Sequence, residues 1–188
     1  ARTIHESYNK KQFESIIVNP VDRYIIESSD DDLQISIHDK TLDRYVVTQG
    51  KARGKLAGGN LTLICSMIGT PYQIDLKDKI VMIEDIGEEP YRMDRMLTQL
   101  IACGELTKAA GIVFGICKKC DKSDKTSAPN SFTLRQVVEE RIAPLGIPAV
   151  YGLSFGHNRN NFTFPIGIDA RLDTANMTIE LMEKAVKS

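Results

Sequence analysis

The clearest pattern of hydrophobic and polar positions lies in residues 80–101. Residues 80–83 are apolar and lead into Glu84, and so short a run, rich in β-branched side chains, predicts a buried strand. After a polar turn, apolar residues recur at helical spacing over residues 91–101, which predicts a helix. Glu84 therefore falls at the C-terminal end of a buried strand, where α/β folds often carry functional side chains. A strand-end carboxylate that only hydrogen-bonds to the next turn is the alternative interpretation.

The rest of the chain alternates short apolar runs with amphipathic segments. The pattern predicts further strands at 24–27, 32–39, 45–48, 111–117, 147–151, 162–172 and 178–181, and further helices before residue 19, over 61–69 and over 134–142. Strands and helices alternate in the middle of the chain, whereas the flanking segments resemble antiparallel strands. We therefore expect a mixed α/β fold, a mixed β-sheet with flanking helices, and no purely parallel doubly wound sheet.

Composition limits the classes of partner. The 188 residues carry a formal net charge of −1, which gives no electrostatic case for binding nucleic acid or an anionic membrane surface. No apolar run approaches the roughly 20 residues that a bilayer span needs. We expect residues 1–22 to be a linker or appendage and residues 23–188 to form one domain.

Two short motifs suggest sites without establishing them. Gly58, Gly59 and Asn60 precede a predicted helix, and glycines before a helix N-terminus can let an anion approach the backbone N–H groups. A tight turn with a helix cap explains the same three residues. Cys117 and Cys120 have CxxC spacing, but a lysine-rich loop follows them and no second ligand pair accompanies them. We therefore predict no metal site and no cofactor.

His157 is the most suggestive single residue. It follows a glycine and precedes a polar run, so we expect it on a loop and outside the core. A loop histidine near a strand end can serve as a general base. A merely exposed histidine is the alternative.

Several motifs occur together in one order and at one set of spacings. They are Arg53-Gly54, Gly58-Gly59-Asn60-Leu61, Gly69-Thr70-Pro71, Ile83-Glu84-Asp85, Tyr91, Asp94-Arg95-Met96-Leu97, Gly104, Gly156-His157 and Pro165-Ile166-Gly167. Over roughly residues 45–182 the chain resembles the C-terminal domain of the L,D-carboxypeptidase family of serine peptidases. That family includes muramoyltetrapeptide carboxypeptidase and the microcin C immunity peptidase.

The resemblance implies that the catalytic residues come from two domains. The family's C-terminal domain, of swivelling β/β/α type, supplies a glutamate and a histidine, and its N-terminal domain supplies the nucleophilic serine of a Ser-His-Glu triad. Carried over to this sequence, Glu84 is the acid and His157 the base. Gly58, Gly59 and Asn60 would line the same cleft and bind the substrate carboxylate.

The resemblance also sets expectations about the whole protein. It implies removal of a terminal D-amino acid from murein tetrapeptides, in the cytoplasm, by a homodimer that needs no cofactor. This chain begins at Ala1 and contains no serine in the expected strand–turn–helix context, so we expect a C-terminal fragment that is inactive without its nucleophile domain. Two alternatives remain: a peptidase of peptidyl-nucleotide antibiotics, and a non-catalytic module that binds peptide or carbohydrate.

Overall fold

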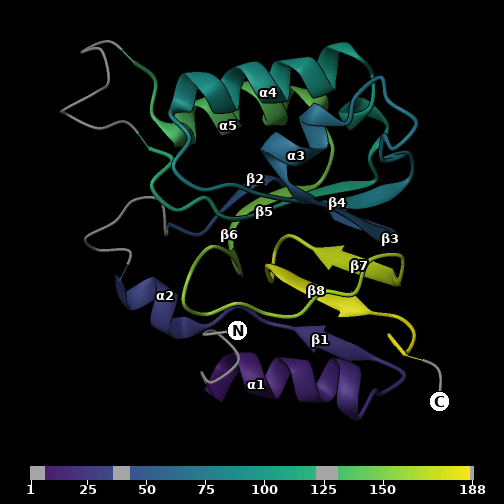
Figure 1. Cartoon of the computed structure of the whole chain (residues 1–188). Helices are drawn as coiled ribbons and strands as arrows, with labels where there is room; N and C mark the ends of the chain where they lie inside the picture. The colour runs from purple at the N-terminus through teal and green to yellow at the C-terminus, as the bar shows by residue number, and fades with distance from the viewer. Residues whose placement is uncertain (1–6, 36–42, 122–130, 187–188) are drawn as a thin grey trace.

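A computed structural model of the chain describes residues 7–35, 43–121 and 131–186. Its centre is an eight-stranded sheet in the order β1-β8-β7-β3-β4-β5-β6-β2 (Figure 1). The strands are β1 (Tyr24–Ile26), β2 (Tyr45–Thr48), β3 (Lys51–Asn60), β4 (Lys79–Glu84), β5 (Gly111–Ile116), β6 (Ala149–Gly156), β7 (Asp169–Asp173) and β8 (Thr178–Leu181). This arrangement confirms the predicted mixed α/β fold.

The middle of the sheet is parallel and its flanks are antiparallel. β3, β4, β5 and β6 run in parallel, whereas β7 joins β3, β8 joins β7, β1 joins β8 and β2 joins β6 in antiparallel pairs. Every residue of β5 and all but the first of β4 are buried. Strands covered on both faces can be apolar throughout, which explains the unbroken hydrophobic runs at these positions.

Helices cover both faces of this sheet. The α-helices are α1 (Ser7–Phe13), α2 (Asp30–Ile35), α3 (Leu61–Ser66), α4 (Pro90–Ala102) and α5 (Leu134–Ile142), and the short helices are η2 (Glu14–Val18), η4 (Leu106–Lys108) and η5 (Ala143–Leu145). Figure 1 shows α3, α4 and α5 on one side and α1 on the other. Two hydrophobic clusters follow, one on each face. Within the described ranges, no helix is long and apolar enough to cross a bilayer.

Three predicted elements differ from the structure. Residues 30–35 form α2 and not the start of a strand, and the predicted residues 36–39 lie outside the described ranges. Three aspartates in the first turn of α2 favour a helix, because carboxylates are stabilised at the positive end of the helix dipole. β7 begins only at Asp169, after a turn at residues 166 and 167, and Phe162 and Phe164 pack against Phe155 in an aromatic cluster before it.

The third difference concerns the glycines before α3. β3 continues through Gly58 and Gly59 to Asn60, so these glycines belong to a strand and not to a turn. Gly58 has φ +118°, and a side chain there would collide with the backbone of Met82 on the neighbouring strand. Glycine at 58 therefore permits the close pairing of β3 with β4.

Candidate active site

Glu84 and His157 meet at one edge of the sheet. Glu84 is the last residue of β4, and His157 directly follows β6. β5 lies between these two parallel strands, so both residues fall at the same C-terminal edge. The structure places Nδ1 of His157 2.7 Å from Oε2 of Glu84. The two residues predicted from distant parts of the sequence are therefore direct neighbours.

Gly156 makes this approach possible. Its φ is +110°, and a Cβ at this position would lie 3.0 Å from Oε2 and 3.1 Å from Cβ of Glu84. A side chain at 156 would thus be strained by the backbone and would also press on the carboxylate. Glycine before His157 leaves room for the Glu84 side chain beside the end of β6.

The exposure of the pair fits a proton-transfer site. The Glu84 side chain is 10% exposed, whereas the His157 side chain is 50% exposed. An ionised carboxylate accepts the Nδ1 proton and so fixes the tautomer in which Nε2 carries a lone pair. Nε2 of His157 is then the ring nitrogen that can take a proton from a reacting group.

A shallow open depression lies beside the pair. Its volume is about 230 Å³, and it is lined by Gly59, Glu84, Phe155, Gly156, His157, Asn161 and Phe164. Gly59 leaves open space where a side chain would stand. Among the residues that the structure describes, no serine lines this depression.

The remaining predicted residue, Asn60, is engaged in local structure. Its Oδ1 accepts the Leu63 N–H, which caps α3, and its Nδ2 donates to Asp85 at 3.0 Å. Asp85 also accepts the N–H and the hydroxyl of Thr62, at 3.0 and 2.8 Å. The N–H groups of Thr62 and Leu63 are thus already bonded within the chain. Of the three residues predicted to bind substrate, only Gly59 lines the depression.

Ser154 is close in sequence to His157 but is not available as a nucleophile. It is fully buried, and its Oγ accepts the Ser29 N–H at 2.9 Å and donates to Asp32. A hydroxyl with both roles filled inside the core cannot reach a substrate.

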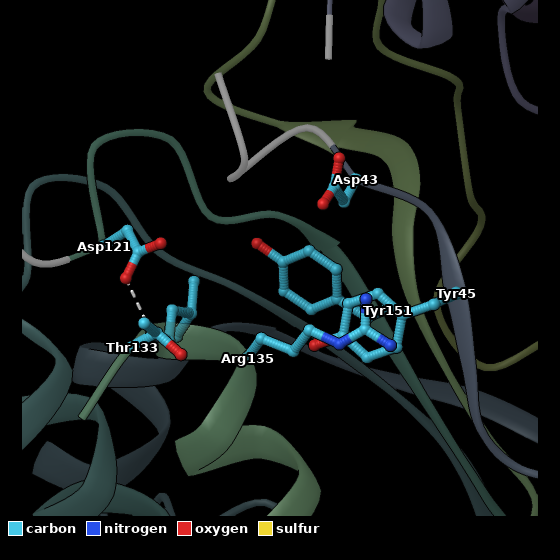
Figure 2. A pocket seen from close by; sticks show the side chains of 7 residues that line it. Asp43, Tyr45, Asp121, Thr133, Arg135 and Tyr151 are labelled. Atoms are coloured by element: carbon cyan, nitrogen blue, oxygen red, sulfur yellow. Dashed lines mark hydrogen bonds between the residues drawn. The ribbon is translucent and has the colours of Figure 1, made fainter. Parts of the chain in front are cut away.

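A second cavity of about 180 Å³ lies near β2 and α5, on the face of the sheet that α3, α4 and α5 cover. Arg135 lies 4.3 Å over the ring of Tyr45, which stacks on Tyr151, and Asp121 accepts the N–H of Leu134 (Figure 2). Figure 2 shows its labelled lining residues, Asp43, Tyr45, Asp121, Thr133, Arg135 and Tyr151. None of them is a residue of the Glu84–His157 site.

The CxxC pair is also separate from that site. Cys117 and Cys120 are buried free thiols. Burial raises the pKa of Cys117 well above its ordinary value and the pKa of Cys120 to about 12. Both side chains are therefore neutral thiols at physiological pH, which makes them poor nucleophiles. In the described parts of the chain, no three His, Cys, Asp or Glu side chains form a group that could hold a metal ion.

Sequence comparison gives a family match. Residues 53–172 match the family model described as LD-carboxypeptidase C-terminal domain. A probable murein peptide carboxypeptidase of Bacillus subtilis is 45% identical over 129 residues, which is 69% of this chain and 40% of that protein. The murein tetrapeptide carboxypeptidase of Pseudomonas aeruginosa is 29% identical over 65% of this chain and 39% of its own length. The chain thus spans about 40% of the length of these relatives.

Structure comparison agrees with the family match. The crystal structure of muramoyltetrapeptide carboxypeptidase from Oxalobacter formigenes superposes with a TM-score of 0.71 at 29% identity, over 94% of this chain and 54% of that one. The structure of MccF in complex with glutamyl sulfamoyl guanosine gives a TM-score of 0.66 at 22% identity, over 78% and 42% of the two chains. The latter likeness concerns the fold alone.

Proposed function

Because this chain belongs to the LD-carboxypeptidase family, with residues 53–172 matching its C-terminal domain, we propose that it supplies the acid and the base of a serine-type carboxypeptidase. The observation that carries the proposal is the 2.7 Å contact between Nδ1 of His157 and Oε2 of Glu84 beside an open depression. A histidine oriented by a carboxylate is the arrangement that activates a hydroxyl nucleophile.

In this mechanism each residue of the chain has a defined task. His157 accepts the proton of the attacking serine at Nε2 and returns it to the departing amine. Glu84 holds the ring in the required tautomer and stabilises the imidazolium. Gly59 leaves space beside the reacting groups. The serine and the oxyanion hole come from a segment outside this chain, in agreement with its coverage of about 40% of its relatives.

The names of the relatives support a murein peptide as substrate. The Bacillus and Pseudomonas proteins are described as carboxypeptidases of murein peptides. We propose that the complete protein removes a terminal D-amino acid from a murein tetrapeptide, and that it does so as a cytoplasmic homodimer in peptidoglycan recycling. Sedimentation of the complete protein would test the dimer.

Turnover by a fusion protein tests the proposal. The part of the Bacillus subtilis relative that precedes its matched region is joined to this chain, and release of D-amino acid from a murein tetrapeptide is measured. We expect turnover by the fusion and none by the chain alone. Glu84→Gln and His157→Asn should each lower kcat by about 10³-fold or more, whereas Glu139→Gln, at an exposed ion pair on α5, should leave it unchanged.

Other outcomes identify the alternatives. Unchanged kcat in both site variants contradicts the proposal. Tetrapeptide binding to the chain without turnover by an otherwise folded fusion indicates a non-catalytic binding module. Cleavage of a peptidyl-nucleotide in place of the tetrapeptide would keep the proposed roles of Glu84 and His157. It would identify the protein as a peptidase of peptidyl-nucleotide antibiotics.

A further inference from the structure

The loop that carries His157 is bound to the N-terminal part of the chain. Residues 157–161 follow β6, and their hydrogen-bond partners include Asn9 of α1 and Asp32 of α2. These partners lie more than 120 residues away in sequence. The family match begins only at residue 53, so both partners precede it.

Asn9 holds the loop with both ends of its amide. Its Nδ2 donates to the carbonyl oxygen of Arg159 at 2.9 Å, and its Oδ1 accepts the N–H of Asn161 at 2.6 Å. Asn9 is 5% exposed, so water does not compete for these bonds. Two bonds from one planar amide to alternate residues fix the path of the loop backbone.

Asp32 provides a second attachment. Its Oδ1 accepts Nδ2 of Asn160 at 3.0 Å, and its Oδ2 accepts the hydroxyl of Ser154. Ser154 lies within β6, and its N–H donates to Oγ of Ser28 at 3.0 Å. Asp32 therefore ties the loop and the strand before it to one buried carboxylate, which is 3% exposed.

The loop transmits these attachments to His157. Nδ2 of Asn161 donates to the carbonyl oxygen of Gly156 at 2.9 Å, and the N–H of Phe162 donates to the carbonyl oxygen of Ser154 at 2.8 Å. His157 thus sits in a short loop closed at both ends on β6. Its side chain is 50% exposed, so the position of its ring depends on the backbone that carries it.

We propose that Asn9 and Asp32 are positioning residues, which hold the loop at 157–161 so that His157 meets Glu84. The expected effect of Asn9 and Asp32 on catalysis rests on the proposed function. Their effect on the position of the His157 ring can be measured without turnover. The proposal assigns to residues 7–35 a part in the site, although this described segment precedes the matched domain and contributes no residue to the depression.

Nitrogen NMR of the isolated chain tests whether Asn9 and Asp32 hold the ring of His157 against Glu84. Long-range ¹H–¹⁵N spectra report which ring nitrogen of a histidine carries the proton, and the spectrum of His157→Asn identifies the His157 signals. We expect the Nδ1–H tautomer in the wild-type chain and a mixture of tautomers in Asn9→Ala and Asp32→Ala. Asn9→Asp keeps the acceptor for the Asn161 N–H and should retain more of the wild-type pattern than Asn9→Ala.

Two controls separate positioning from folding. Gln12→Ala removes another buried amide from α1, and Lys11→Ala removes an exposed side chain. Neither should change the His157 tautomer, even if Gln12→Ala lowers the Tm as much as Asn9→Ala. A wild-type tautomer pattern in both Asn9→Ala and Asp32→Ala overturns the inference, and so does an equal change in Gln12→Ala.

Kinetics of the fusion protein test whether the position of His157 affects catalysis. Misplacing the base should lower kcat of Asn9→Ala by about tenfold or more, with KM within about twofold, because the substrate site is intact. A lower kcat with an unchanged tautomer contradicts the positioning role. A fusion that fails to turn over in wild-type form counts against the proposed function and leaves the NMR result to decide this inference.

Discussion

Gly156 shows how closely the site depends on single residues. Its missing side chain leaves the space that the Glu84 carboxylate fills, and its φ of +110° turns the chain from β6 into the loop of His157. Neither constraint is visible in the local sequence, because the neighbour that a side chain would meet is 72 residues away. Asn9 and Asp32 are also single residues on which the site depends. Each makes two hydrogen bonds through the two polar atoms of its side chain.

Gly156→Ala should break the contact between Glu84 and His157. We expect the Nδ1–H tautomer signal of His157 to be lost and the free energy of unfolding to fall by about 1–3 kcal/mol. Gly167→Ala is the matched control, since Gly167 also has a positive φ of +87° but open space at its Cβ position. It should cost stability through the backbone alone and leave the tautomer unchanged; an equal loss of the signal in both variants would contradict the steric explanation.

The cysteines give a second test at the residue scale. Cys117 and Cys120 are buried with raised pKa values, and burial also raises the pKa of Cys65 to about 11, whereas Cys103 is exposed. At pH 7.5 we expect a disulfide reagent such as DTNB to label one thiol of the folded chain quickly and the other three only after unfolding. Cys103→Ser should abolish the fast phase. A fast reaction that survives in Cys103→Ser contradicts this assignment.

At the scale of elements, the start of α3 is joined to the end of β4. Asp85 follows β4 and accepts bonds from Asn60, Thr62 and its neighbour Ile86. It is 3% exposed, so its removal would leave buried donors without acceptors. The Ile83-Glu84-Asp85 motif therefore combines two tasks: Glu84 faces His157, and Asp85 fixes the helix that follows β3.

Asp85→Ala should lower the free energy of unfolding by about 2–4 kcal/mol, because unsatisfied buried donors keep their full desolvation cost. Urea denaturation of the chain measures this change. Asp75→Ala is the control, since Asp75 is exposed and accepts the N–H of Lys77. A loss as large as that of Asp85→Ala would show that burial of the carboxylate is not the cause.

The buried carboxylate of α2 gives a pH dependence. Burial raises the pKa of Asp32 above its ordinary value, although bonds from Ser154 and Asn160 and the charge of Arg44 oppose the change. Because the pKa is higher in the folded than in the unfolded chain, the folded state holds the proton more tightly. Stability from this group is present below the ordinary pKa and is lost as pH rises through the raised value.

Asp32→Asn removes this titration. We expect the cost of the substitution, measured as the difference in unfolding free energy from wild type, to be larger near pH 3 than near pH 7. Parallel urea denaturation series at several pH values measure it, with Asp31→Asn, at an exposed neighbour, as the control. A cost that grows with pH would mean that the folded state favours the ionised carboxylate.

At the scale of the whole molecule, the sequence predicted most strands of the sheet, including the edge strands β1 and β2, but it did not predict β3. β4, β5, α4 and α5 follow from apolar runs and helical spacing, because each is stabilised by burial of its own pattern. Residues 32–35 were predicted wrongly as the start of a strand and belong to α2. The partners of Asp32, which are Ser154 and Asn160, lie 122 and 128 residues away. Long-range polar contacts leave no periodic trace in a sequence.

The candidate site divides in the same way. Glu84 was predicted as a candidate because it ends a buried strand. The family resemblance then paired it with His157, and the structure contains this contact. The loop attachments by Asn9 and Asp32 could not be predicted, because they depend on how α1 and α2 lie against the loop after β6. The local bonding of Asn60 was also hidden, since Asp85 reaches it only once β3 and β4 pair.

The proposed function requires that Glu84 and His157 activate a serine that lies outside this chain. Its most direct test is the rate at which a fluorophosphonate labels the fusion protein, with the labelled residue located by mass spectrometry of its peptides. We expect one labelled serine, in the segment joined to the chain, and a labelling rate that is lower by about 100-fold or more in Glu84→Gln and His157→Asn. Labelling at the wild-type rate in both variants, or no labelling of a fusion that hydrolyses the tetrapeptide, would contradict it.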